Sequence, residues 1–181
     1  MPIELIDSHC HFDFPEFDEA RASQWQACRA LGLKSLLMPG VAVDQWLKLQ
    51  SLCASMPDLV YGVGIHPWWA ARSGLDEDLQ GAAAPFLQDR ACVAIGECGL
   101  DGQIETPLTP QIALLERHLQ LASDRALPVI LHVRAAHREL LACLKRFHLP
   151  AGGVIHAYTG SLQQAQSYLD LGLHLGVGGA V

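Results

Sequence analysis

The sequence predicts an α/β fold, a (β/α)8 barrel of the TIM type that is incomplete, with about seven β/α units and the last strand and helix missing. Short apolar runs of strand type alternate with helix-type patterns along the whole chain. Such alternation indicates parallel strands joined by right-handed crossovers. The runs are short and apolar, as expected of strands that are covered on both faces.

The length and charge of the chain restrict the class of protein. Its 181 residues are expected to form a single domain, residues 1–181, with enough mass for a large core. The net charge of -7 argues against a protein that coats nucleic acid, because such proteins are strongly basic. It does not exclude an enzyme that takes a nucleic-acid end into a small local pocket.

The cysteines and the apolar runs indicate where in the cell the protein is expected. Six cysteines are scattered along the chain without a Cys-x-x-Cys pair, which predicts reduced thiols rather than a disulfide scaffold. No basic segment followed by a long apolar stretch opens the chain, and no window approaches the roughly 18 apolar residues of a membrane span. We therefore expect a cytoplasmic protein with no membrane partner and no evident obligate protein partner.

The expected strands are apolar runs that end at glycine, proline or histidine. The first begins at Ile3 and leads into His9 and His11. Successive side chains of a strand point to opposite faces, so these two imidazoles lie on the same face and can bind one ion. The other six expected strands lie at residues 35–38, 59–65, 91–95, 128–131, 153–155 and 173–177.

Helix-type patterns lie between these strands, and their ends carry capping residues. Gly32 and Gly172 close helices where a left-handed residue is favoured. Asp44 and Ser161 suit helix N-caps, and Thr109 before a proline has the chemistry of a helix start. The expected helices lie at residues 17–31, 44–55, 70–86, 109–126, 135–147 and 161–171.

Metal-binding residue types fall at the C-terminal ends of the expected strands. In a parallel barrel these ends meet at one rim, and catalytic groups come from several of them. An apolar core has no reason to admit four histidines and a glutamate unless they are paired or ligating. The residues at the expected strand ends are His9, His11, His66, Glu97, His132 and His156. The other histidines, His118, His137, His148 and His174, do not follow this rule; the first three are expected on helix surfaces or ends, and all four in structural roles.

The number of nitrogen and oxygen donors indicates two ions. Five donors exceed the three that a catalytic zinc normally takes from protein. Two divalent ions that share a carboxylate are therefore expected, with Glu97 as the bridge, and zinc, manganese, magnesium and iron all suit such ligands. A pair of metals of this kind serves phosphoester hydrolysis.

Five motifs along the chain resemble the successive signatures of the TatD family, metal-dependent deoxyribonucleases within the amidohydrolase-like barrels. They are residues 7–11, 64–67, 95–101, 128–134 and 154–161. The resemblance covers essentially the whole chain in family order and spacing. It implies a TIM-type barrel and a divalent-metal hydrolase that cleaves phosphodiester bonds, often from the 3′ end of single-stranded DNA. DNA ends or short oligonucleotides are the expected substrates.

The resemblance also implies roles for individual residues. It places His9 and His11 on the first ion and His132 and His156 on the second, with Glu97 between them.

Substrate contacts are implied in the same way. His66 and Arg134 are implied to approach the substrate phosphate, with Asp101 beside them. Arg134 suits this role because its planar guanidinium donates hydrogen bonds in pairs. The expected catalytic residues are therefore Glu97, His66, Asp101 and Arg134.

The chain departs from the family pattern at two places. After Asp101 the family usually has an aromatic pair, where this chain has Gly102 and Gln103. The family also continues past the seventh expected strand to an aspartate that completes the first metal site, whereas this chain ends at Val181. We expect a C-terminally shortened version of a longer enzyme, with self-association through open barrel edges.

Two other functions remain open at the level of sequence. The same metal pair can polarise a carbonyl, as in a carboxylic ester or amide hydrolase such as a D-aminoacyl-tRNA deacylase. Many amide-cleaving relatives bridge their metals with a modified lysine, and Lys34, Lys48 and Lys145 are not suitably placed. The third reading is an inactive truncated fragment that binds metal or a partner.

Overall fold

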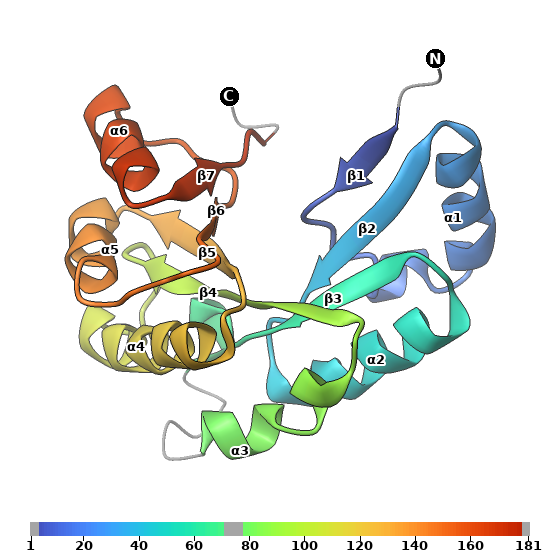
Figure 1. Cartoon of the computed structure of the whole chain (residues 1–181), viewed down its shortest axis with the longest axis horizontal. Helices are drawn as coiled ribbons and strands as arrows, with labels where there is room; N and C mark the ends of the chain where they lie inside the picture. The colour runs from blue at the N-terminus through green and yellow to red at the C-terminus, as the bar shows by residue number, and fades with distance from the viewer. Residues whose placement is uncertain (1–3, 71–77, 179–181) are drawn as a thin grey trace.

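The chain folds around one parallel sheet. The computed structural model describes residues 4–70 and 78–178. Seven strands pair in chain order, each parallel to the next. They are β1 (Leu5–Asp7), β2 (Leu33–Pro39), β3 (Leu59–Val63), β4 (Cys92–Asp101), β5 (Val129–Arg134), β6 (Gly153–Ile155) and β7 (Leu173–Leu175). Figure 1 shows the sheet curled into a half-barrel, which confirms the predicted α/β class and barrel type.

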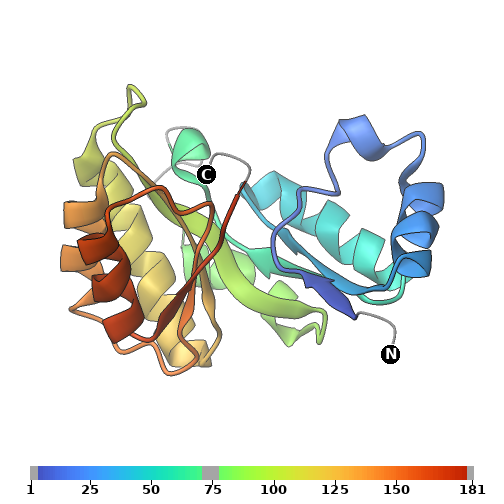
Figure 2. The same cartoon turned by 90° about the horizontal axis from the view of Figure 1, so that it is seen from above.

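Helices connect the strands and lie around the outside of the curled sheet (Figures 1 and 2). They are α1 (Arg21–Ala30), α2 (Trp46–Ser55), α3 (Leu79–Ala83), α4 (Leu108–Arg125), α5 (His137–Leu144) and α6 (Leu162–Asp170). Short 3-10 turns lie at η1 (Pro15–Phe17), η2 (Val43–Gln45), η3 (Pro67–Trp69) and η4 (Phe86–Gln88). Because helices follow strands, the C-terminal ends of the strands and the first turns of the helices lie at the same rim.

Some predicted helix ends are confirmed. Ser161 is the N-cap of α6: its side chain accepts a hydrogen bond from the backbone N–H of Gln164, whose side chain accepts from the backbone N–H of Ser161. This reciprocal pair satisfies two donors that the helix leaves free. Gly32 and Gly172 have positive φ angles of 104° and 79°, the left-handed conformation expected after a helix.

Other predicted boundaries were wrong. Asp44 lies within the turn η2 and makes no capping hydrogen bond, because the chain enters α2 through that turn and Gln45 precedes the helix. Thr109 lies inside α4, which begins one residue earlier after Pro107. The pattern over 17–31 divides into the end of η1 and the helix α1. The pattern over 70–86 yields α3 and the first residue of η4, and residues 71–77 lie outside the described part of the chain.

Strand β4 is twice as long as the run that predicted it. The pattern predicted a strand over 91–95, whereas β4 spans Cys92–Asp101. Gly96 and Gly99 have φ angles of 138° and 149°, and the pairing with β5 shifts register between Ile95 and Cys98. A Cβ atom at Gly99 would clash with the carbonyl oxygen of His132. Glycine therefore lets β4 continue beside β5, and Glu97 lies inside a central strand rather than at its end.

His118 corrects a prediction about the surface. It was expected on a helix surface or end but is fully buried on α4. Its Nε2 accepts the backbone N–H of Ile65 at 3.0 Å, while its Nδ1 lies 2.8 Å from the carbonyl oxygen of Leu114. Since a carbonyl can only accept, the proton of the neutral ring is on Nδ1. His118 thus links α4 to the segment that leads out of β3.

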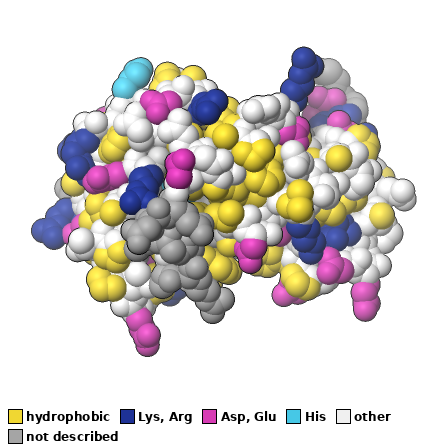
Figure 3. All heavy atoms as spheres, turned by 90° about the horizontal axis from the view of Figure 1, so that it is seen from below, with side chains coloured by type: hydrophobic (Ala, Val, Ile, Leu, Met, Phe, Trp, Pro, Cys, Tyr) yellow, Lys and Arg dark blue, Asp and Glu magenta, His cyan; other side chains and the backbone are white. Residues whose placement is uncertain are grey.

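The remaining predictions concern the surface and the thiols. All six cysteines are free. Within residues 4–70 and 78–178, no helix is long and apolar enough to cross a membrane. On the face drawn in Figure 3, acidic and basic side chains are intermixed among the described residues and hydrophobic ones gather near the middle. This face therefore carries no single basic patch.

Candidate metal centre

Glu97 lies at the centre of a group of imidazoles. Its side chain is buried, and each of its carboxylate oxygens faces two histidines. Oε2 lies 3.2 Å from Nε2 of His9 and 3.4 Å from Nε2 of His11. Oε1 lies 3.4 Å from Nδ1 of His132 and 3.6 Å from Nε2 of His66. Each oxygen of the carboxylate therefore has two imidazole nitrogens close to it.

Backbone hydrogen bonds hold the loops that bring these side chains together. His9 and His11 lie just beyond β1, where the N–H of Cys10 donates to the carbonyl of Leu37 in β2 at 3.1 Å. His156 directly follows β6, and its N–H donates to Leu131 of β5 at 2.9 Å. Residues far apart in the sequence thus meet at one rim of the sheet, as the strand-end positions predicted.

His132 is held between two carboxylates. Its Nε2 lies 3.3 Å from Oδ2 of Asp101, the last residue of β4, while its Nδ1 faces Glu97. Asp101 can only accept at this oxygen when ionised, so the imidazole proton lies on Nε2 and Nδ1 presents a lone pair. A histidine oriented in this way by a carboxylate is the usual arrangement of a metal ligand.

His66 has the opposite tautomer. Its backbone N–H donates to Val41, and its Nδ1 accepts the backbone N–H of Trp68 at 3.2 Å. The proton of the neutral ring therefore lies on Nε2, the atom that faces Glu97. A protonated nitrogen cannot bind a metal ion but can donate a hydrogen bond to an oxygen. His66 is thus suited to a role beside the metal ligands rather than among them.

His9 and His11 present donor atoms that no protein group uses. In the described part of the chain, both ring nitrogens of His9 and Nδ1 of His11 are buried without a hydrogen-bond partner. Nε2 of His9 is close to Glu97, yet the two atoms do not form a hydrogen bond of good geometry. Buried polar atoms are almost always satisfied, so these nitrogens fit a cation that both residues and Glu97 could share.

The protonation states also suit cation binding. Burial raises the pKa of Glu97, but the neighbouring imidazoles of His11, His132 and His9 outweigh burial and hold it well below its usual range. Burial lowers the pKa of His66 to about 4, against an opposing effect of Glu97. Burial, together with the nearby His9, lowers the pKa of His156 to about 4. Near neutral pH the centre therefore holds the ionised carboxylate of Glu97 beside the neutral imidazoles of His66 and His156. Deprotonated groups are the forms that bind metal ions.

The structure brings most of the predicted site residues together. Nitrogen and carboxylate atoms close enough to share an ion occur in two groups within the described residues: His9, His11 and Glu97, and His66, Glu97 and His132. His156 belongs to neither group; its ring stacks on that of His9. Arg134 ends β5 with an exposed side chain. The predicted metal site is thus a coherent cluster, with Arg134 at its margin.

The sequence did not single out two residues that support Asp101. Nε1–H of Trp68 donates to Oδ2 of Asp101 at 2.9 Å. The buried side chain of Gln111 on α4 accepts the backbone N–H of Asp101 and donates to its carbonyl, at 2.8 and 3.0 Å. Trp68 directly follows the motif at residues 64–67. A large aromatic residue next to a motif at the rim was the one feature of the sequence that could have indicated its role.

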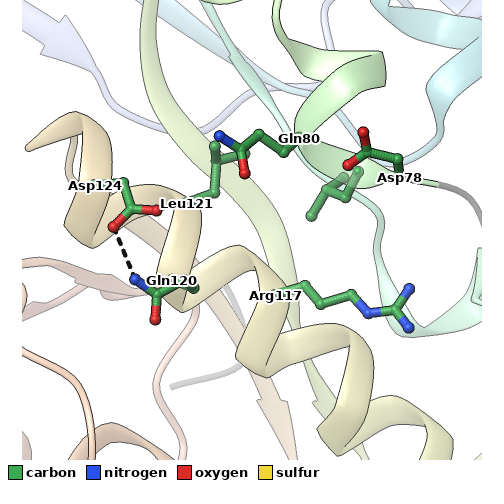
Figure 4. Close-up of a pocket in the computed structure, with 7 residues that line it drawn as sticks. Asp78, Gln80, Arg117, Gln120, Leu121 and Asp124 are labelled. Atoms are coloured by element: carbon green, nitrogen blue, oxygen red, sulfur yellow. Dashed lines mark hydrogen bonds between the residues drawn. The ribbon is translucent and has the colours of Figure 1, made fainter.

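A separate pocket lies between α3 and α4 and shares no residue with this cluster. Figure 4 shows Gln120 donating to Asp124 at its edge, a hydrogen bond of 2.7 Å. The residues that line the pocket are Asp78, Leu79, Gln80, Arg117, Gln120, Leu121 and Asp124. None of them is a histidine or a cysteine, so the histidine cluster is the stronger site for metal chemistry.

Comparison with known proteins identifies the family. The family model described as TatD related DNase matches residues 6–181. The chain belongs to the TatD family. A protein of Escherichia coli K12 described as the uncharacterized metal-dependent hydrolase YjjV is 35% identical over 182 residues, which cover 100% of this chain and 70% of that protein. The 3′-5′ ssDNA/RNA exonuclease TatD of a Rahnella species is 34% identical over 170 residues, which cover 92% of this chain and 64% of that protein.

Solved structures support the TatD fold. The crystal structure of YjjV from Escherichia coli K12 matches with a TM-score of 0.90 and 35% identity, over 99% of this chain and 70% of that one. An uncharacterized amidohydrolase of Saccharomyces cerevisiae matches with a TM-score of 0.82 at 18% identity, over 97% of this chain and 68% of that one, which shows the fold alone. The prediction of a metal-dependent hydrolase of the TatD type that acts on ester bonds is thereby confirmed.

Proposed function

We propose that this TatD protein hydrolyses phosphodiester bonds at the ends of single-stranded DNA, as a 3′-5′ exonuclease that uses two divalent metal ions. The observation that carries the proposal is the position of Glu97, whose Oε2 faces His9 and His11 while its Oε1 faces His132. A single-ion site would need only one of these oxygens. The name of the Rahnella relative, a 3′-5′ ssDNA/RNA exonuclease, supports the choice of substrate.

In this proposal each ion has its own histidines. His9 and His11 hold the first ion and His132 and His156 the second, with Glu97 shared between them. Zinc, manganese and iron suit this set of histidines and a carboxylate, whereas magnesium prefers oxygen ligands. When bound, such ions supply Lewis acidity at the phosphate and an activated water.

The protein's own groups then orient the reacting atoms. Asp101 fixes the tautomer of His132, so that Nδ1 remains a donor to a cation. Nε2–H of His66 points into the centre and donates to a phosphate oxygen of the substrate, which helps to stabilise its charge. Arg134, at the margin, binds a phosphate further along the strand with its forked guanidinium.

The charge distribution favours recognition of strand ends over binding along a duplex. The net charge is -7, and the face in Figure 3 shows intermixed charges rather than a basic stripe. Affinity for a long nucleic acid depends on many cationic contacts. A short end bound chiefly by metal ions does not need them. We also propose that residues 1–181 act as one domain; a cytoplasmic location and self-association through the outer strands stay predictions.

The test is cleavage of a single-stranded DNA oligonucleotide that is labelled at its 5′ end. With Mn²⁺ or Zn²⁺, the chain should shorten the strand stepwise from the 3′ end and release mononucleotides. EDTA should abolish this activity, and Glu97→Gln should lower it at least about a hundredfold, because the bridge between the ions is lost. Retention of full activity by Glu97→Gln would contradict the bridging role.

Two controls separate this reaction from others. Glu116→Gln removes a carboxylate from α4 outside the cluster and should leave cleavage unchanged. A D-aminoacyl-tRNA substrate tests the alternative chemistry: hydrolysis of its ester bond without any cleavage of DNA would favour the deacylase reading instead.

A further inference from the structure

Trp68 is both exposed and held in place. Of its side chain, 54% is accessible to solvent. Yet its Nε1–H donates to Asp101, and its backbone N–H donates to Nδ1 of His66. Its ring also contacts His66 edge to face at 5.2 Å and lies within 25° of parallel to the ring of Trp69 at 6.2 Å. An exposed aromatic ring held by one hydrogen bond and two ring contacts differs from a free surface side chain.

The contacts place this ring beside the metal centre. Oδ2 of Asp101 accepts from Trp68 and also lies 3.3 Å from Nε2 of His132, and Nδ1 of His132 is 3.4 Å from Glu97. Three consecutive contacts therefore connect the indole to the bridging carboxylate. The indole also contacts His66, whose Nε2 lies 3.6 Å from Oε1 of Glu97, so one imidazole separates the indole from the centre.

Among the described residues, Trp68 is also the only aromatic one in the set of large, exposed hydrophobic side chains. The others are aliphatic: Leu5, Ile6, Leu31, Leu47, Leu162, Leu169 and Val177. An indole combines a large apolar face with a polar N–H, and such side chains are enriched where proteins bind their partners. The exposed indole beside the cluster is therefore suited to bind a planar ligand.

We propose that Trp68 is a substrate-binding residue whose indole stacks on the base of the nucleotide at the scissile end of the strand. This inference rests on the proposed function, because it is the phosphodiester at the centre that brings a base to the ring. The residues after Asp101, Gly102 and Gln103, offer no ring at this position. Trp68 supplies the aromatic surface from a different loop, the one that follows β3.

A nucleobase is the occupant that these contacts favour. Every base has a flat face, and stacking on an aromatic side chain binds single strands with little regard to sequence. The base and its phosphate are joined through one sugar, which matches the short path from Trp68 to Glu97. Because the ring is already fixed, stacking requires little further ordering of the protein. Purines, which have the larger face, should bind more tightly than pyrimidines.

The test measures binding rather than cleavage, so that it does not depend on catalysis. The probe is a short single-stranded DNA with a fluorophore at its 5′ end, compared with the same strand lacking the base of its 3′-terminal nucleotide. Fluorescence anisotropy gives the dissociation constants, with Mn²⁺ present to hold the strand end and phosphorothioate linkages in the strand to slow its cleavage. Trp68→Leu should weaken binding of the complete strand at least about fivefold, and Trp68→Phe should weaken it less because a ring remains.

The decisive quantity is the coupling between the side chain and the base. Trp68→Leu should weaken binding of the complete strand but leave binding of the abasic strand nearly unchanged, because the partner of the indole is already missing. Equal losses with both strands, or no loss with either, would overturn the proposal. Leu31→Ala is the matched control: Leu31 is 82% exposed at the end of α1, next to the start of β2 and away from the rim.

Failure of this inference and failure of the proposed function give different results. If the metal-loaded wild type shortens DNA while Trp68→Leu shows no coupling, the stacking role is wrong and the nuclease function stands. If coupling is present but no metal restores cleavage, the base-binding surface stands and the proposed reaction is wrong. A raised KM with little change in kcat for Trp68→Leu would agree with both.

Discussion

The imidazole rings of His9 and His156 lie 3.4 Å apart between their centroids and within 9° of parallel. This stack joins the loop after β1 to the residue that follows β6, so loops from the two halves of the described sheet meet at the centre. We predict that His156→Ala and His156→Phe both lower the affinity for Mn²⁺ at least about tenfold, because both variants lose the imidazole nitrogen. Phenylalanine keeps a ring that can stack on His9, whereas alanine does not. Calorimetric titration of the EDTA-treated protein measures this affinity.

The phenylalanine variant is the informative one. If it binds Mn²⁺ as tightly as the wild type, His156 only packs against His9 and is not a ligand. His174→Phe changes an exposed histidine on β7 and serves as the control that should keep wild-type affinity.

Asp101→Asn should weaken metal binding without unfolding the protein. Burial raises the pKa of Asp101, but hydrogen bonds from Trp68, the N–H of Gln103 and His132 outweigh it, so the carboxyl stays ionised. An amide cannot accept at both oxygen positions, and the tautomer of His132 is no longer fixed. We expect Mn²⁺ affinity to fall about 10- to 100-fold, measured by titration. Asp124→Asn, on the exposed surface of α4, should have no effect; an equal loss there would contradict the assignment.

Gly99→Ala should destabilise the fold strongly. The φ of Gly99 is 149°, and a Cβ there would clash with the carbonyl oxygen of His132. We expect the free energy of unfolding in urea to fall by more than about 3 kcal/mol. Gly172→Ala is the matched comparison, since Gly172 also has a positive φ but nothing within 4 Å of its Cβ position; its cost should be about 1 kcal/mol. Similar losses in both variants would show that the contact with His132 is unimportant.

His118 should make the stability of the metal-free protein depend on pH. Burial lowers the pKa of His118 to about 4, against an ordinary value of 6.5 in the unfolded chain. Between these values the unfolded chain binds the proton and the folded protein does not, so the free energy of unfolding falls as the pH drops from 6.5 towards 4. The contribution of this residue is about 3 kcal/mol over that interval.

His118→Gln removes the proton-binding group and keeps an acceptor for the N–H of Ile65. Urea unfolding at several pH values should therefore show a shallower loss of stability below pH 6.5 than in the wild type. The slope that remains includes His66 and His156, whose pKa values are also lowered by burial. At lower pH it also includes the carboxylates of Glu97 and Asp101, whose pKa values lie below their usual range. His148→Gln, on the surface, should leave the wild-type curve unchanged. An unaltered curve in His118→Gln would show that its burial does not set this dependence.

Much of the fold could be predicted from local patterns, because strand-type runs ending in histidine or glycine are distinct from helix patterns. The length of β4 could not, since glycines normally end a strand. At Gly96 and Gly99 they instead allow a close approach to β5, a condition set by a neighbouring strand. The prediction that Asp44 caps a helix was wrong for a related reason, because residues that suit an N-cap also suit the short turn that precedes α2.

The site shows the same division. Residue types at strand ends were enough to predict which histidines meet around Glu97, because topology carries those ends to one rim. The proton positions on His66 and His132 depend on Trp68 and Asp101, partners that sequence spacing does not reveal. The burial of His118 likewise depends on a backbone donor from the segment after β3, so a histidine on a helix could not be placed inside from its own pattern.

The location of Glu97 within β4 has a consequence for how such an enzyme can diversify. The carboxylate is carried by a strand that is paired on both sides, whereas Trp68 stands on the loop after β3. Mutations in that loop can replace one side chain at the rim by another, while the pairing of β4 with β3 and β5 keeps the Glu97 carboxylate in its position. New substrate preferences can therefore be acquired by changing the periphery, with the inherited chemistry left in place.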